Sequence, residues 1–171
     1  ELKPYGLSLK VYDCYRPKRA VIDFVNWSRD RKQRQMRKEF YPNVNKADLF
    51  SLGYISERSG HSRGSTVDVT LVPIPTPKQA SFTPGQKLYP CMAITSRRFH
   101  DNSIDMGTRF DCLDTSANFS YAGVSLRAMQ NRWLLRYLMV KYGFEPYDTE
   151  WWHFTLRKEL YPNTYFDFPV S

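Results

Sequence analysis

The chain has 171 residues, enough for one domain with a sizeable core, since a domain takes about 150 residues. Apolar residues make up 42% and charged residues 25%, a composition that excludes both a disordered tail and a membrane bundle. No apolar stretch approaches the roughly 20 residues of a transmembrane helix. We therefore expect a single domain over residues 1–171 without a membrane span.

Most of the net charge of +8 comes from one stretch of the chain. Its basic residues are Lys18, Arg19, Arg29, Arg31, Lys32, Arg34, Arg37 and Lys38. Such a patch suits an anionic partner such as nucleic acid, a membrane surface or an acidic polymer. A solvated helix face is the simpler interpretation, and it is favoured because no base-reading motif accompanies the charge.

The first third of the chain predicts a strand, a helix and a loop. Residues 7–15 alternate and are rich in β-forming residues, and the strand should end near Arg16 because Pro17 cannot continue a ladder. Pro17 suits the first turn of a helix over residues 18–38, whose apolar spacing is clear only in its first half. Residues 41–60 are mixed and predict a loop.

The rest of the chain predicts two strands, a long loop and a second helix. Residues 66–72 form a strand, and prolines open a loop over residues 73–104. Helical spacing is strongest over residues 125–142, with Gly143 as the C-terminal cap, and residues 150–156 form a final strand. Without a regular βαβα alternation, these elements predict an α+β fold with a small mixed sheet, mainly antiparallel, and flanking helices.

One histidine and one carboxylate lie close together in the segment SGHSRGSTVDVTL. His61 lies in a turn between Gly60 and Gly64, and Asp68 lies within the following strand. Glycines allow the chain to fold back, so both side chains can reach one ion. Imidazole and carboxylate ligands suit zinc, although the same pair also occurs in ordinary hydrogen bonds.

His153 completes a possible ligand set. A catalytic zinc uses three protein ligands, and a nearby carboxylate that is not a ligand takes the proton of the water. His61, Asp68 and His153 would supply the ligands and Glu150 the base. Residues three apart on an ideal strand face opposite sides, so Glu150 must lie at the entrance of its strand to approach the ion. The neighbouring Trp151, Trp152 and Phe154 suit core packing.

Arg16 is a further candidate at the end of the first predicted strand. Alternation places Tyr12, Cys14 and Arg16 on one side of that strand, and Val11, Asp13 and Tyr15 on the other. An arginine at the rim of a zinc site could stabilise the oxyanion that forms when water attacks a carbonyl. An ordinary surface ion pair is the alternative for Arg16, and spacing alone favours it.

Three cysteines are too few for a disulfide scaffold. Cys91 and Cys112 bracket a loop, and a bridge between them would resist unfolding and require an oxidising compartment. Two buried free thiols are the alternative. Cys14 would remain unpaired in either case.

Four ordered segments resemble the zinc D-alanyl-D-alanine dipeptidases and their carboxypeptidase relatives. They are YDCYRP (12–17), SGHSRGSTVDVTL (59–71), DMGTRFD (105–111) and EWWHF (150–154). The resemblance implies an α+β fold with the zinc site on the sheet and His61, Asp68 and His153 as ligands. It also implies Glu150 as general base and acid, and Arg16 as the residue that stabilises the transition state.

The resemblance further implies that Ser59 contacts a dipeptide and that Asp105 or its neighbours hold the substrate ammonium. His100 matches nothing and is expected on the surface. Relatives carry an N-terminal segment before the YDCYRP motif, which we expect this chain to lack. The expected activity is hydrolysis of D-alanyl-D-alanine, without a nucleic-acid partner.

Two alternatives stay open: a D-Ala carboxypeptidase or related peptidoglycan hydrolase that acts on longer stem peptides, and a non-catalytic, metal-stabilised binding module. A retained Glu150 argues against the second, because a structural zinc needs no spare carboxylate. A bridge between Cys91 and Cys112 and a substrate derived from the cell wall favour a periplasmic or secreted protein over a cytoplasmic one.

Overall fold

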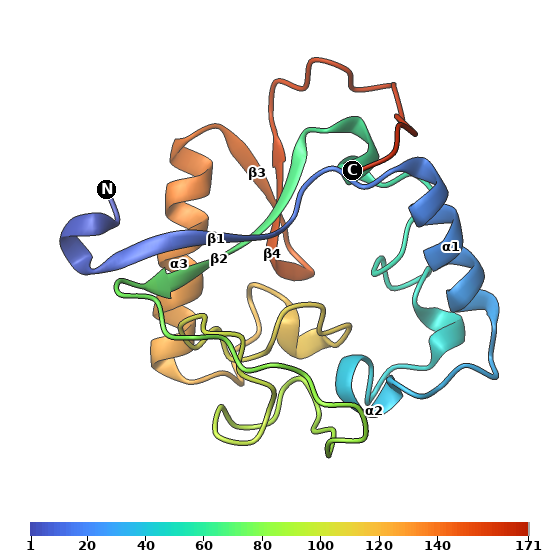
Figure 1. The fold of residues 1–171 in the computed structure, drawn as a ribbon. Helices are drawn as coiled ribbons and strands as arrows, with labels where there is room; N and C mark the ends of the chain where they lie inside the picture. The colour runs from blue at the N-terminus through green and yellow to red at the C-terminus, as the bar shows by residue number, and fades with distance from the viewer. Residues whose placement is uncertain (171) are drawn as a thin grey trace.

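A four-stranded sheet is the framework of the computed structural model, which describes residues 1–170 (Figure 1). The strand order is β1-β2-β4-β3. Their bounds are Leu7–Asp13 for β1, Thr66–Pro73 for β2, Phe144–Tyr147 for β3 and Glu150–Leu156 for β4. All three pairings are antiparallel, which confirms the α+β prediction and makes this sheet antiparallel throughout.

Three α-helices flank the sheet: α1 (Lys18–Arg29), α2 (Arg37–Phe40) and α3 (Leu126–Lys141). Helix α3 lies against the sheet, whereas α1 and α2 lie together at the other end of the molecule (Figure 1). None of the helices formed by residues 1–170 has the length and apolar character needed to cross a bilayer.

The core consists of two separate clusters. The sheet-side cluster joins β2, β4 and α3 and contains Val69, Leu71, Cys91, Met106, Cys112, Ala117, Leu135, Met139, Trp151, Trp152 and Phe154. The helix-side cluster contains Val21, Val25, Tyr41, Val44, Leu49, Tyr54, Ile55 and Leu113. Both tryptophans and Phe154 are buried, as expected for core residues.

The helix predicted over residues 18–38 ends at Arg29, so the prediction is wrong in its second half. The Asp30 carboxylate accepts the backbone N–H of Lys32, a local bond that competes with helix continuation. The buried Lys46 ammonium then donates to the carbonyls of Asp30 and Gln33, at 2.7 and 2.8 Å. A side chain from a later part of the chain thus holds this segment out of the helix.

Helix α3 begins and ends close to where the sequence predicts. The Ser125 hydroxyl caps its first turn by accepting the backbone N–H of Ala128 at 3.1 Å. Gly143 follows at φ +89°, the left-handed conformation that glycine adopts most readily. Strand β3 follows directly and was not predicted.

Apart from Pro73, the last residue of β2, the long segment 73–104 has no helix or strand, in agreement with the prediction of a loop. It is joined to the following segment by a disulfide between Cys91 and Cys112, whose Cα atoms lie 5.4 Å apart. This confirms the predicted bridge over the alternative of two free thiols. Cys14 is an exposed free cysteine.

Candidate metal centre and its pocket

His61 is held by the turn of its backbone and by one hydrogen bond of its ring. It lies on a short 3-10 helix, where the Ser59 hydroxyl accepts its backbone N–H at 3.3 Å. A Cβ at Gly60 would lie 2.3 Å from the hydroxyl oxygen of Thr66, so this close turn requires glycine. His61 Nδ1 lies 2.7 Å from the Cys14 carbonyl oxygen, to which it donates a hydrogen bond. The other ring nitrogen, Nε2, is therefore free to bind a metal.

Asp68 and His153 are brought together by strand pairing. They are register partners on β2 and β4, and His153 Nδ1 lies 3.1 Å from Asp68 Oδ1. His61 Nε2 lies 3.3 Å from Asp68 Oδ2. Burial raises the pKa of the Asp68 carboxyl, but His153 and His61 outweigh that effect and hold it below its usual value. Asp68 therefore faces both histidines as a carboxylate.

The three side chains fit a metal ion. One ligand atom from each lies within 4.8 Å of the others. Asp68 Oδ1 is buried and, although His153 Nδ1 lies near it, it accepts no hydrogen bond in the described chain, so a cation or water would satisfy it. Two imidazoles and a carboxylate are a donor set that zinc accepts, with bonds of about 2.0–2.2 Å.

Glu150 lies beside this set without belonging to it. Its Oε2 is 3.5 Å from His153 Nδ1. Phe154 of β4 pairs with Pro146 of β3, and Glu150 of β4 pairs with Tyr147 of β3. One step along β3 therefore corresponds to four steps along β4. This irregular register brings Glu150 to the same side as His153, at the strand entrance, as predicted. Burial, with the charges of Asp68 and Asp111, raises the pKa of Glu150 well above its usual value, and Arg16 partly opposes this.

A pocket of about 560 Å³ opens over the centre. His61, Asp68, His153 and Glu150 line one side of it, and Arg16 and Ser59 are also lining residues. The opposite wall is largely apolar and comprises Val21, Phe24, Trp27, Met36, Phe40, Tyr41, Tyr54, Ile55 and Leu113. The volume falls within the roughly 300–1,000 Å³ typical of small-molecule sites.

Arg16 both lines the pocket and forms an ion pair. Its guanidinium donates two hydrogen bonds to Asp13 Oδ2, at 2.6 and 2.9 Å. The prediction that Asp13 and Arg16 face opposite sides is wrong, because β1 has a register irregularity between Val11 and Asp13 and ends at Asp13. Asp13 Oδ2 also lies 4.0 Å from His61 Nδ1, so this pair is close to the metal site.

Asp105 is not among the residues that line this pocket. Its carboxylate pairs with Arg98 and accepts the backbone N–H of Gly107 at 2.9 Å. Asp111, six residues later in the same segment, does line the pocket. Asp111 is an exposed residue at the pocket, and partial loss of hydration together with the charge of Asp68 raises the pKa of its carboxyl. The sequence segment DMGTRFD contains both carboxylates, and nothing in it showed which one enters the pocket.

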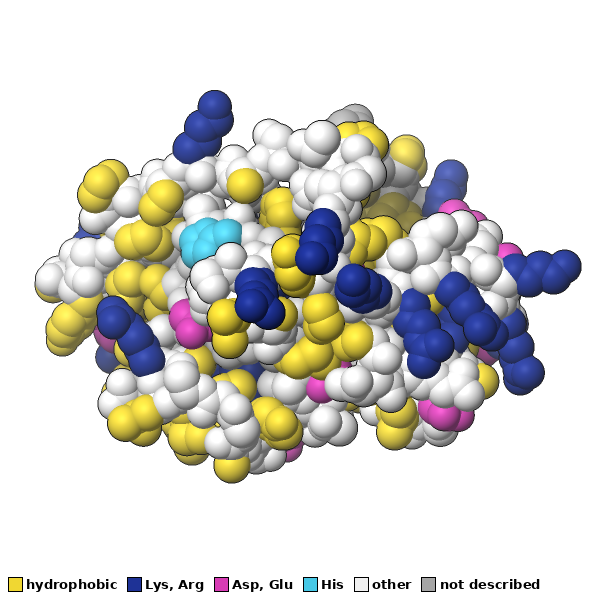
Figure 2. Space-filling view, turned by 90° about the horizontal axis from the view of Figure 1, so that it is seen from below, with side chains coloured by type: hydrophobic (Ala, Val, Ile, Leu, Met, Phe, Trp, Pro, Cys, Tyr) yellow, Lys and Arg dark blue, Asp and Glu magenta, His cyan; other side chains and the backbone are white. Residues whose placement is uncertain are grey.

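The basic stretch lies at the end of the molecule formed by α1 and α2. Figure 2 shows Lys and Arg side chains gathered at that end of the face. Within the described chain, no ion pair involves the exposed residues Arg31, Lys32, Arg34, Arg37 and Lys38. His100 is exposed as expected.

The comparisons with known proteins agree with this geometry. The family description "Peptidase_M15: D-ala-D-ala dipeptidase" matches residues 73–171. A D-alanyl-D-alanine dipeptidase of Enterococcus faecium is 38% identical over 166 residues, which cover 97% of this chain and 70% of the relative. One from Streptomyces coelicolor is 36% identical with the same coverage. One from Escherichia coli is 28% identical over 151 residues, 88% of this chain and 56% of the relative.

The three candidate ligands, their buried neighbouring carboxylate and the similarity along nearly the whole chain lead to the same result. This chain belongs to the D-Ala-D-Ala dipeptidase family of metal-dependent peptidases, Peptidase_M15.

Proposed function

We propose that this chain hydrolyses the peptide bond of D-alanyl-D-alanine, with a zinc ion held by His61, Asp68 and His153. The observation that carries the proposal is the position of Glu150. Its carboxylate lies 3.5 Å from a ligand nitrogen, yet it is not needed to complete the three-residue set. A purely structural metal site has no use for such a group, whereas hydrolysis requires a base.

Zinc, when bound, supplies a Lewis acid that makes water more acidic and polarises a carbonyl. Glu150 accepts the proton of the attacking water and returns it to the leaving amine. Burial raises the pKa of Glu150 above its usual value, which makes it a stronger base than an exposed glutamate. Burial of Asp68 and His61 keeps the centre rigid while the proton moves.

Arg16 and Asp111 have complementary roles in this proposal. The Arg16 guanidinium at the pocket edge stabilises the negative charge that develops on the carbonyl oxygen. Asp111 receives the ammonium of the substrate, in place of Asp105, because only Asp111 lines the pocket. Ser59 lines the pocket as well, but its hydroxyl already caps the turn that carries His61.

The size of the pocket favours a second substrate class. A volume of 560 Å³ and an apolar far wall leave room beyond a dipeptide of two alanines, as a longer stem peptide would require. Release of a single D-alanine from a pentapeptide stem would make the chain a carboxypeptidase. We keep the dipeptide as the first candidate because the matching relatives carry that name.

We further propose that the protein works in the periplasm or outside the cell. The bond between Cys91 and Cys112 supports this location, since disulfides persist in oxidising compartments and are rare in the cytosol.

One experiment tests the proposal: metal analysis of the intact protein, combined with assays on free D-alanyl-D-alanine and on a pentapeptide stem that ends in it. We expect one zinc per chain and release of free D-alanine from the dipeptide. Hydrolysis of the stem alone would establish the second candidate. Stoichiometric zinc without hydrolysis of either substrate would contradict both.

A further inference from the structure

The direction of the Asp111 carboxylate is set by the backbone conformation of this residue. It lines the pocket, but within residues 1–170 it forms no side-chain hydrogen bond or ion pair that would fix its direction. Its backbone has φ +58°, in the left-handed region that few residues other than glycine adopt and that aspartate tolerates better than most. The position of the carboxylate therefore depends on how its neighbours are anchored.

Those neighbours are anchored through Cys91. The Cys91 carbonyl accepts the backbone N–H of Arg109 at 2.9 Å, and the Cys91 N–H donates to the Glu39 carbonyl at 2.9 Å. On the other side of Asp111, Cys112 is covalently bonded to Cys91. Leu113 continues the attachment, because its N–H donates to the Phe40 carbonyl at 2.8 Å.

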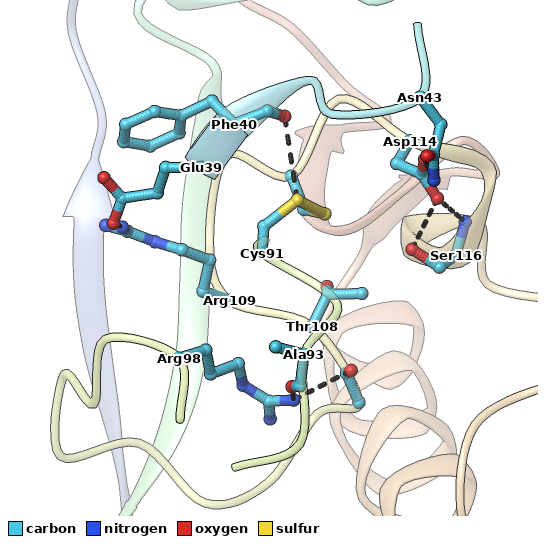
Figure 3. Close-up of a disulfide and its surroundings, with 12 residues drawn as sticks. Glu39, Phe40, Asn43, Cys91, Ala93, Arg98, Thr108, Arg109, Asp114 and Ser116 are labelled. Carbon is cyan, nitrogen blue, oxygen red and sulfur yellow. Dashed lines mark hydrogen bonds and ion pairs between the residues drawn. A yellow bond between two sulfur atoms is a disulfide. The ribbon is translucent and has the colours of Figure 1, made fainter. Parts of the chain in front are cut away.

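Side chains reinforce the same junction. Arg109 pairs with the buried Glu39, and its guanidinium lies 4.5 Å from the ring centre of Phe40. Figure 3 shows Glu39 beside Arg109 and a dashed line from the Cys91 sulfur to the Phe40 carbonyl, a contact of 3.7 Å. Both cysteines are completely buried. The disulfide is thus the covalent centre of a junction that joins the end of α2, the long loop and the segment carrying Asp111.

We propose that the Cys91–Cys112 disulfide is a positioning device for substrate recognition: it aims Asp111 at the amino end of the substrate, and its reduction weakens recognition of that end. This inference rests on the proposed function and on Asp111 as the ammonium acceptor. Reduction breaks the S–S bond, and two electrons and two protons convert the sulfurs to two thiols. A pair of thiols such as glutathione supplies them and is itself oxidised to a disulfide.

The metal ligands and Glu150 have anchors of their own, although Trp151, Trp152 and Phe154 beside them share the sheet-side cluster with both cysteines. His61 is held by the Cys14 carbonyl, and Asp68 and His153 by pairing of β2 with β4. Reduction should therefore change recognition of the ammonium more than hydrolysis itself. A merely structural disulfide would instead lower all activities together.

The test compares two substrates that differ only at the amino end. One is D-alanyl-D-alanine, and the other is D-lactoyl-D-alanine, in which a hydroxyl replaces the ammonium while the scissile amide is the same. Values of kcat/KM are measured for the oxidised protein and for the protein reduced with a phosphine. The phosphine reduces the disulfide to two thiols and is itself oxidised to a phosphine oxide, whose oxygen comes from water. Thiol counts confirm the redox state, and zinc content and circular dichroism are followed in parallel.

We expect the preference for the ammonium substrate to fall about tenfold or more on reduction, mainly through KM, as for a lost hydrogen bond to a charged group. Activity on the hydroxyl analogue and zinc content should change less than about twofold. The double variant C91S/C112S should match the reduced protein and should not respond to the phosphine. D111N should show little preference in either redox state.

Three results would overturn the inference. The preference could survive complete reduction, both substrates could lose activity equally, or reduction could unfold the chain, which would make the bridge a folding element only. Failure of the oxidised protein to hydrolyse either substrate would instead overturn the proposed function, on which the inference depends. The activity of the oxidised protein therefore distinguishes failure of the inference from failure of the proposed function.

Discussion

The two walls of the pocket are built differently. The metal-binding wall is held largely by strand pairing: Asp68 and His153 are register partners, and Glu150 begins the same strand as His153. The opposite wall consists of apolar side chains from α1, α2 and the loops after them, which form their own cluster. Backbone hydrogen bonds thus fix the atoms that react, while side-chain packing sets the shape and size of the space around them.

The largest effect should follow from removing a ligand on the metal-binding wall. Both His61→Ala and His153→Ala should lose stoichiometric zinc and, with it, turnover, because a three-residue set with one member missing binds weakly. Metal analysis after dialysis measures the loss. Stoichiometric zinc in both variants would show that the ion lies elsewhere.

The next largest effect should come from Glu150. Glu150→Ala should keep the zinc but lower kcat about 10²–10⁴-fold, as expected for the loss of a general base. Glu150→Gln keeps the shape of the side chain and should be impaired to a similar degree. Near-normal turnover in either variant would leave the mechanism without its base.

Arg16 should have a smaller and more selective effect. Arg16→Ala should reduce kcat by about 10²–10³ and change KM less, because an oxyanion contact strengthens in the transition state. Loss of this positive charge should also raise the pKa of Glu150 and Asp111 further, since Arg16 lowers both. Arg16→Lys retains the charge and serves as the control. A change in KM alone would make Arg16 a residue that binds the ground state.

The apolar wall should tolerate change with little effect on the chemistry. Trp27→Leu removes a half-buried ring that packs edge-on against Tyr41 and should cost about 1–3 kcal/mol of stability. Turnover of the dipeptide should fall by no more than a few-fold, while the ratio between stem peptide and dipeptide should shift. Assays of both substrates, with thermal unfolding of the variant, check this. A loss of kcat as large as that of Glu150→Ala would erase the distinction between the two walls.

The smallest effect should be on the pH dependence of stability in the metal-free protein. Partial loss of hydration and the charge of Asp68 raise the pKa of Asp111 above its unfolded value of about 3.9, and solvent screens the effect on stability because the residue is exposed. A raised carboxyl pKa stabilises the fold fully below the unfolded value, and this contribution is lost as pH rises through about 7. Thermal unfolding between pH 4 and 8 should therefore show a decline that is shallower in Asp111→Asn. Identical slopes would mean that Asp111 has an ordinary pKa.

The sequence predicted the metal-binding wall better than the opposite one. His61 and Asp68 lie in a single short segment, and the requirement that Glu150 leave the strand alternation is met by the irregular register of β4. These features are local, so spacing could indicate them. The sequence leaves a Cys91–Cys112 bridge and two free thiols as alternatives, and the structure has the bridge.

What the sequence could not show depends on contacts between distant segments. The predicted helix stops at Arg29 because Lys46 holds the following loop, and Asp13 approaches His61 because of an irregularity in β1. Strand β3 has only four residues, one of them Pro146, so no strand pattern was visible. The choice between two carboxylates of one segment likewise depends on distant anchors.

The irregular register of β3 and β4 has a consequence for how this region tolerates change in length. Side chains on a strand alternate, so one inserted or deleted residue turns every following side chain to the other face. Between Glu150 and His153, such a change would alter the three-residue spacing that the irregular register accommodates, and it would shift either Glu150 against Tyr147 or His153 against Asp68. In a library of single-residue insertions and deletions across residues 144–156, we therefore expect no active clone with a change in length between Glu150 and His153. Conservative substitutions there at positions other than Glu150 and His153 should survive.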